Sequence, residues 1–250
     1  MSNACTSSPR EQCQWHRERK SPHHGATRFA HCRRPPRCSP YLSTRATRPQ
    51  SETPACVLTP AQAEGPFFVD ERLERSDIRS DPADDTMRQG TPLALTLRIA
   101  ALADGRCAPL ANAIVDVWHC DAEGRYSDAQ GMGMRTKGSK FLRGYQITDA
   151  NGHVRFTTIY PGAYPGRAVH IHFKVRTQGD RSREFTSQLY FDDALTDRVH
   201  AHPPYAGAIS RRMRNAGDGL FRNRGRALVL DVVERGEGFA AQYDVGVRLT

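Results

Sequence analysis

The feature of this sequence that most constrains its fold is a series of short stretches in which apolar and polar residues alternate. A period of two puts every second side chain on the same face of a β-strand, so one face can be buried. Turn residues separate eight such stretches, where we expect strands: 93–100, 112–119, 144–148, 153–159, 168–175, 185–191, 226–233 and 242–249. Eight short strands at this spacing predict an all-β fold, a sandwich or a barrel, and we favour an antiparallel β-sandwich with long connecting loops.

Three further segments have a local interpretation. The strands expected at 144–148 and 153–159 flank a turn that contains Asn-Gly, which predicts a β-hairpin. Residues 192–202 form the only convincing helical stretch, a short helix with Asp192 or Asp193 as its N-cap. Residues 56–82 have no clean period, and we expect an extended arm there with at most one helical turn.

The first fifty residues differ in composition from the rest. The chain has 250 residues and a net charge of +9, and most of this excess comes from nine Arg and one Lys within residues 1–50, against Glu11 and Glu18. A segment so basic and so poor in apolar periodicity cannot bury a core. We therefore expect a disordered basic tail at 1–50 and one folded domain at 51–250. An organellar presequence and a misplaced start codon both stay open as origins of the tail.

Two features of the tail and body could suggest other partners. Cys32 and Cys38 lie near three histidines, but their spacing does not match a C-x2-C zinc pair, and we expect no zinc module there. The body is nearly neutral, which argues against nucleic acid as a partner. The arginines between residues 211 and 226 are interpreted as a solvated face or a subunit contact, which leaves a homo-oligomer open.

The sequence also bears on location. No run of eighteen apolar residues is present, so we expect no membrane span. No export signal is readable at the N-terminus, which favours the cytoplasm. A periplasmic or secreted protein stays open if the N-terminus is mis-assigned. In that case Cys56 and Cys107 could pair, although spacing alone does not fix a connectivity.

The sharpest chemical signal is the pair His170 and His172 in the strand expected at 168–175. Residues two apart on a strand point to the same face, so two imidazoles stand side by side as half of a metal site. Taken alone, the pair would more often lie on a solvated strand edge. Its surroundings favour the metal site, because the loop before the strand carries Tyr160 and Tyr164, and Tyr126 follows another strand and a glycine turn.

Tyrosine is a poor ligand at its ordinary pKa of about 10. A hard trivalent cation can stabilise the phenolate, and among biological metals Fe(III) fits best. Two phenolates and a hydroxide neutralise Fe3+, so that the ion can be buried without uncompensated charge.

Four stretches together resemble the intradiol ring-cleavage dioxygenases: LTPAQAEGPFF (58–68), VDVWHCDAEGRYSD (115–128), PGAYPGRAVHIHF (161–173) and FTSQLYF (185–191). The resemblance covers roughly residues 56–250 and is greatest to the protocatechuate-like branch. It implies a non-haem Fe(3+) held by Tyr126, Tyr164, His170 and His172. It also implies that Arg167, Gln188 and Tyr126 are catalytic.

The implied reaction joins a catechol-type substrate with O2. The ring opens between its two hydroxylated carbons and gives a cis,cis-muconate-type diacid, as in the catabolism of aromatic compounds. A leaving tyrosinate takes a substrate proton, Arg167 stabilises charge that develops on the ring, and Gln188 helps to orient it. Two other functions stay open from the residues alone: a non-catalytic sandwich domain that binds carbohydrate or protein, and a zinc hydrolase built on the histidine pair.

The remaining candidates are interpreted as structural or solvated. Tyr160 is not expected to be a ligand, because the family pattern selects Tyr164. His119 and Cys120 face opposite ways at a strand end, so we expect structural roles for both. We expect the other histidines of the body at the surface, namely His153 in a strand and His200 and His202 in a Pro-rich segment where the helix passes into a loop.

Overall fold

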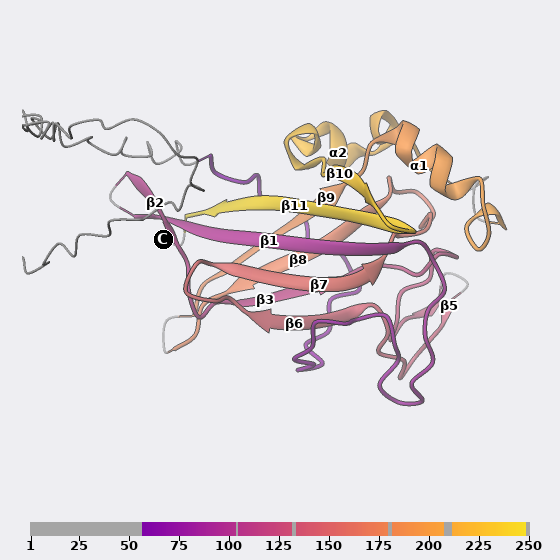
Figure 1. The fold of residues 1–250 in the computed structure, drawn as a ribbon, viewed down its shortest axis with the longest axis horizontal. Helices are drawn as coiled ribbons and strands as arrows, with labels where there is room; N and C mark the ends of the chain where they lie inside the picture. Colours follow the sequence, from indigo (N-terminus) through magenta and orange to yellow (C-terminus); the bar gives the residue numbers. More distant parts are fainter. Residues whose placement is uncertain (1–56, 104, 132–133, 180–181, 208–211, 249–250) are drawn as a thin grey trace, which may run out of the picture. The chain divides into compact units, whose positions relative to one another are not determined.

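The computed structural model describes residues 57–103, 105–131, 134–179, 182–207 and 212–248, which build two β-sheets (Figure 1). The first sheet has the order β10 (Asp231–Arg235), β11 (Gly238–Val247), β1 (Pro92–Ala103) and β2 (Arg106–Pro109), and β7 (His153–Ile159) also pairs with β1. The second has the order β6 (Arg143–Ile147), β3 (Ile114–Trp118), β8 (His170–Arg176) and β9 (Glu184–Tyr190). A small ribbon joins β4 (Gln130–Gly131) to β5 (Met134–Arg135). The tail expected at 1–50 lies outside the described residues.

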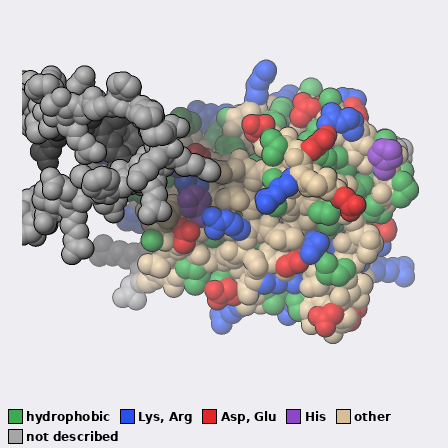
Figure 2. Space-filling view, in the orientation of Figure 1, with side chains coloured by type: hydrophobic (Ala, Val, Ile, Leu, Met, Phe, Trp, Pro, Cys, Tyr) green, Lys and Arg blue, Asp and Glu red, His purple; other side chains and the backbone are tan. Residues whose placement is uncertain are grey.

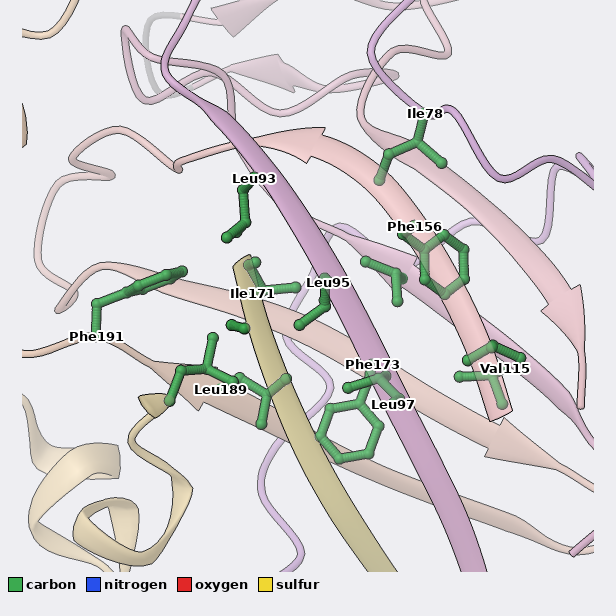
Figure 3. Packing of buried hydrophobic residues seen from close by; sticks show 14 of the residues in the cluster. Ile78, Leu93, Leu95, Leu97, Val115, Phe156, Ile171, Phe173, Leu189 and Phe191 are labelled. Atoms are coloured by element: carbon green, nitrogen blue, oxygen red, sulfur yellow. The ribbon is translucent and has the colours of Figure 1, made fainter. Parts of the chain in front are cut away.

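The two sheets pack face to face, which confirms the all-β sandwich. Leu93, Leu95 and Leu97 alternate along β1 and are fully or almost fully buried. Figure 3 shows them against Ile171 and Phe173, which come from β8 in the other sheet. Each such side chain contributes about 1.5–3 kcal/mol when it is removed from water. Because side chains alternate along β8, its even-numbered residues from 170 to 174 lie on the outer face of the four-stranded sheet.

One strand pair departs from the antiparallel pattern. β1 and β11 run parallel over nine residue pairs, from Leu93 opposite Phe239 to Ala101 opposite Val247 (Figure 1). All other pairs within the sheets are antiparallel. Alternation alone shows which face of a strand is buried but not the direction of its neighbour, so this pairing has no local signal.

The expected helix is present. α1 (Asp193–His200) begins at Asp192, whose side chain accepts hydrogen bonds from the backbone N–H groups of Ala194 and Leu195. This is an N-cap, which satisfies donors that have no partner inside the helix. A shorter helix, α2 (Gly219–Arg222), begins at Asp218 in the same way. Two 3-10 turns, η2 (Asn215–Gly217) and η3 (Gly225–Leu228), flank α2.

The predicted hairpin at 144–159 is wrong. The turn itself forms, since the carboxylate of Asp149 accepts hydrogen bonds from the N–H groups of Asn151 and His153. The chain then crosses between sheets, because β6 pairs with β3 and β7 pairs with β1. Phe156 of β7 lies opposite Leu95 of β1 and packs into the core between the two sheets.

The strand expected at 226–233 is also displaced. Its first residues form η3, in which Leu228 is fully buried, and β10 begins only at Asp231. Three strands were not expected from the sequence, β2, β4 and β5, and each has four residues or fewer.

Two predictions of solvated side chains are wrong. His200 is fully buried, stacks on Tyr205 with ring centroids 5.0 Å apart, and forms a hydrogen bond of 2.9 Å with the carbonyl oxygen of Pro161. The side chain of Arg212, from the basic run, is 5% exposed and forms ion pairs with Asp193 and Asp197 of α1. His202 and Arg222 are exposed, as expected.

The described surface carries charges of both signs. Figure 2 shows Lys and Arg side chains interspersed with Asp and Glu over the face in view. Within the described part of the chain, no helix is long and apolar enough to cross a membrane.

Candidate functional site

Two histidines form the centre of the candidate site. His170 and His172 share the outer face of β8, as the alternation predicts, and are 3% and 2% exposed. Their Nε2 atoms lie 2.9 Å apart. The Nδ1 atom of His170 lies 2.6 Å from the carbonyl oxygen of Ala168, which can only accept, so Nδ1 carries the proton. The lone pair of His170 is therefore on Nε2 and faces into the site.

Neighbouring strands fix the planes of these rings. Trp118 of β3 lies opposite His172 and stacks on it, with ring centroids 4.9 Å apart and an interplanar angle of 9°. On the other side, Gln188 of β9 lies opposite His172 and Tyr190 lies opposite His170. Neither Trp118 nor Tyr190 was expected at the site from the sequence. Tyr190 had a usable signal, since it is two residues from Gln188 and therefore on the same face of its strand.

Two of the three candidate tyrosines join the histidines. The hydroxyl of Tyr126 lies 3.1 Å from Nε2 of His170 and donates to it, and Tyr126 is 1% exposed. The ring of Tyr164, which is half-buried, meets Tyr126 edge-on at a centroid distance of 5.5 Å. Tyr160 instead lies in the core, where its hydroxyl is 2.7 Å from Oγ1 of Thr196. The choice of Tyr164 over Tyr160 is therefore consistent with the geometry.

The loops that carry the two tyrosines lock together through glycines. Gly124 has φ +82°, and a Cβ atom there would lie 2.1 Å from the carbonyl oxygen of Ala163, next to Tyr164. Gly162 approaches the other loop as closely, since its Cβ would lie 2.3 Å from the carbonyl oxygen of Ala122. No larger residue fits at either position without moving the backbone.

The expected arm forms a wall of the site. Phe67 stacks on Tyr126 with ring centroids 4.3 Å apart, and its carbonyl oxygen accepts a hydrogen bond from Arg143. Gly65 passes over His172, where an added Cβ would be 3.4 Å from the ring. Glu64 forms an ion pair with Lys174, two residues beyond His172. The arm is thus held against the sheet on both sides of the histidines.

Arg167 lies just outside the regular strand. β8 begins at His170, and the turn at Pro165-Gly166 precedes Arg167. Its Nη2 atom donates to Oε1 of Gln188 at 2.6 Å, so the two predicted catalytic residues are brought together. Its Nε atom donates to Asp218 at 2.8 Å. Asp218 was not expected at the site from the sequence, because nothing local links it to a residue 51 positions earlier.

The electrostatics of the four side chains favour neutral forms unless a cation is present. Burial raises the pKa of Tyr126 well above its ordinary value and also raises the pKa of Tyr164. Burial, and next the nearby charge of Arg167, lowers the pKa of His170 to about 3. The site therefore offers two imidazole nitrogens and two phenol oxygens as metal ligands. The phenol oxygens become strong ligands only when a bound cation stabilises them as phenolates.

The residues present fit a transition metal. Two nitrogens bound side by side to one metal ion at about 2.1 Å each lie about 3 Å apart, close to the 2.9 Å between the Nε2 atoms. The buried Nδ1 atom of His172 has no hydrogen-bond partner among the described residues. Across the same residues, no group of three or more His, Cys, Asp or Glu is arranged to hold a metal, so tyrosine oxygens would have to complete the set.

The other candidates lie elsewhere. His119 is buried and bonded on both sides, to the carbonyl oxygen of Cys120 at 2.8 Å and to Oγ1 of Thr158 at 2.7 Å, which supports a structural role. Cys120 is a buried free thiol. His153 is half-exposed in β7. Cys107 is disulfide-bonded, while Cys56 lies outside the described residues.

Comparisons with known proteins identify the family of this chain. A family model described as "Dioxygenase" matches residues 63–213. The beta chain of protocatechuate 3,4-dioxygenase from Burkholderia cepacia is 29% identical over 177 residues, which cover 67% of this chain and 71% of that one. Catechol 1,2-dioxygenase from Acinetobacter baylyi is 32% identical over 155 residues, 52% of this chain and 45% of that one. A solved intradiol ring-cleavage dioxygenase from Tetranychus urticae is 31% identical, with a TM-score of 0.67 and coverage of 77% of this chain and 95% of that one.

Proposed function

Because the chain belongs to the family of intradiol ring-cleavage dioxygenases, which are oxidoreductases, we propose that it cleaves a catechol-type ring with O2 between the two hydroxylated carbons. The product would be a cis,cis-muconate-type diacid, and the role would be the catabolism of aromatic compounds. The observation that carries the proposal is the convergence of His170, His172 and Tyr126 on one point, with Tyr164 at its edge.

A non-haem ferric ion would be held by Tyr126, Tyr164, His170 and His172. Its chemistry would be that of a Lewis acid and electron acceptor toward a bound diphenol. The hydrogen bond from His170 Nδ1 to the carbonyl oxygen of Ala168 keeps the other ring nitrogen free to bind. Stacking on Trp118 holds the plane of His172.

The protein's own groups would manage the protons and the charge. A tyrosinate released to the site can accept a proton from a substrate hydroxyl, and Tyr126 is the candidate because its burial raises the pKa of the phenol, which favours its protonated form. The guanidinium of Arg167 would stabilise negative charge that develops on the ring, with Gln188 fixing its Nη2 end. Phe67 and Trp118 would limit the entry of water.

We also propose a location for the protein, on the basis of one cysteine. Disulfides persist in oxidising compartments and are rare in the cytosol. The disulfide at Cys107 therefore favours an exported protein over the cytoplasm that the sequence suggested. Alkylation of the native protein with and without prior reduction, followed by mass spectrometry of the Cys107 peptide, tests this directly. A thiol at Cys107 that alkylates without reduction would contradict it.

The test of function uses the purified full chain. We expect iron on metal analysis, a visible absorption band, and O2 uptake with at least one of catechol, protocatechuate and hydroxyquinol. Mass spectrometry should find a diacid that has gained both atoms of O2. His170→Ala should lose the metal, whereas His153→Ala, a histidine on the other sheet, should keep it. Oxygen uptake with none of the three substrates, or an aldehyde product from cleavage beside the hydroxyls, would reject the proposal.

A further inference from the structure

We propose that Asp218 is a positioning residue for catalysis. One oxygen of its carboxylate caps the helix α2, and the other holds the guanidinium of Arg167 in the orientation needed for the reaction. The inference rests on the proposed function, because it assigns Asp218 a part in the reaction that Arg167 assists. Asp218 acts through Arg167 and is not placed in contact with the substrate.

The two oxygens of Asp218 have separate partners. Oδ1 accepts from the backbone N–H groups of Leu220 at 2.7 Å and Phe221 at 3.3 Å, which is the N-cap of α2. Oδ2 accepts from Nε of Arg167 and from the backbone N–H of Ala168, each at 2.8 Å. Both carboxylate oxygens are thus hydrogen-bonded, and Asp218 is buried, with only 1% of the residue exposed. A carboxylate in such a place needs all of these donors.

A helix cap alone does not require this arrangement. Asp192 caps the longer helix α1 through Oδ1 alone, which accepts from Ala194 and Leu195, and it is exposed. A serine or threonine hydroxyl serves as a cap equally well. The second oxygen of Asp218 therefore has another role, and its two partners both belong to the segment that leads into His170.

Arg167 depends on this contact for its orientation. It precedes β8 and has no strand ladder to hold it, and its only ion-pair partner among the described residues is Asp218. Oδ2 of Asp218 fixes the Nε edge of the guanidinium, while Gln188 fixes Nη2 at 2.6 Å. Two contacts on different edges of a planar group define its plane, whereas one contact leaves it free to turn.

The arm contacts both the helix that Asp218 caps and a neighbour of Arg167. Gln62 of the arm donates from Nε2 to the carbonyl oxygen of Leu220 at 2.9 Å, in the helix that Asp218 caps. The hydroxyl of Tyr190 donates to Oε1 of Gln62 at 2.5 Å and lies 3.3 Å from Nη2 of Arg167. The contacts close a ring from Arg167 through Asp218, α2, Gln62 and Tyr190 back to Arg167. Asp218 is therefore connected to Arg167 both directly and through α2, Gln62 and Tyr190.

The catalytic test compares Asp218→Asn and Asp218→Ser with Asp192→Asn. Both Asp218 variants keep an oxygen for the cap of α2 but lose the second carboxylate oxygen. We expect kcat to fall by about 10²-fold, approaching the loss for a displaced charge-stabilising group, with KM changed much less. Iron content and the visible band should stay at the wild-type level. Asp192→Asn, a cap aspartate away from Arg167, should leave kcat unchanged.

A double variant separates positioning from a general effect on folding. If Asp218 acts through Arg167, then Arg167→Ala with Asp218→Asn should be no slower than Arg167→Ala alone. Losses of kcat that multiply in the double variant would overturn the proposal, and so would kcat within twofold of wild type in both Asp218 variants.

A second measurement does not depend on turnover. Urea unfolding of the metal-free wild type, Arg167→Ala, Asp218→Asn and the double variant forms a cycle that reports the coupling of the two side chains. Stabilities that simply add would overturn the proposal even if the Asp218 variants proved inactive. If the wild type cleaves no catechol, the proposed function fails, while this cycle still shows whether the two residues are paired.

Discussion

The Nε2 atom of His170 lies 2.9 Å from the Nε2 atom of His172, and the two rings meet at an interplanar angle of 76°. Because His170 carries its proton on Nδ1, at most one proton, from His172, can lie between these nitrogens. If His172 donates it, the buried Nδ1 of His172 holds an unused lone pair. A cation between the rings would allow both Nε2 lone pairs to point at it, with the proton of His172 then on Nδ1.

The two tyrosines of the site should control the colour of the metal-loaded protein. Tyr126→Phe and Tyr164→Phe are each expected to shift or bleach the visible band, because each removes a phenolate oxygen that would bind the iron. Tyr160→Phe is the matched control, since its hydroxyl is bonded to Thr196 in the core. Absorption spectra at equal iron content make the comparison. Loss of the band in Tyr160→Phe would mean that the wrong tyrosine of the loop had been chosen.

Removal of residues 1–50 is expected to leave metal binding and turnover intact. The prediction comes from composition, because that segment concentrates basic residues and has no apolar period.

A substitution within the arm should instead lower the stability of the domain. Phe67→Ala removes the ring that stacks on Tyr126 and should lower stability by about 2 kcal/mol, a typical cost for a partly buried aromatic side chain. Urea unfolding and iron analysis of both proteins test the contrast, and a truncated chain that loses its iron would refute the first half.

His119 should make stability depend on pH. Burial lowers its pKa to about 4, against about 6.5 in an unfolded chain. The folded state therefore binds fewer protons between these values, so the contribution of His119 is complete above pH 6.5 and is lost as the pH falls toward 4. Between pH 7 and pH 5 the loss should be about 2 kcal/mol.

The matched variant for this effect is His119→Gln, in which a polar amide that does not titrate replaces the imidazole ring. Urea unfolding of the metal-free proteins at both pH values isolates the contribution of His119, because His170, His172 and His200 titrate in both. Equal losses of unfolding free energy in the two proteins would show that His119 is not the cause.

Alternation was sufficient to predict most strands and the shared face of His170 and His172, because a period of two is a property of the single strand. It could not predict partners. The alternation in segment 153–159 is compatible with pairing to β6 or to β1, and in the structure the segment pairs with β1. The parallel pairing of β1 with β11 is likewise a property of the whole chain path.

The site shows the same division. The four residues of the metal set could be selected because each lies in a short motif that resembles one family. The residues that hold this set in place carried weaker signals. Asp218 reaches Arg167 from 51 residues away, and Trp118 became a partner of His172 only through the register of β3 and β8. His200 had a local signal, since it lies four residues after Thr196 and residues four apart share a face of a helix.

Arg167 should separate catalysis from metal binding. Arg167 lies three positions before His170, and at this odd offset it would point away from the histidines in a regular strand. The turn at Pro165-Gly166 keeps it outside β8, and its side chain reaches Gln188, which lies opposite His172. The guanidinium is therefore beside the site but has no lone pair with which to bind a metal.

Arg167→Ala is accordingly expected to keep its iron and its visible band while kcat falls by about 10²–10³-fold, the usual cost of removing one donor to developing charge. The KM should rise less, because the substrate would still be held by its two oxygens. Arg155→Ala, on the exposed face of β7, is the control for the loss of an arginine and should match the wild type. Metal analysis and steady-state rates on a substrate that the wild type accepts decide the matter. An iron-loaded Arg167→Ala with a wild-type rate would remove Arg167 from the reaction, and with it the reason for a buried carboxylate at Asp218 to hold it.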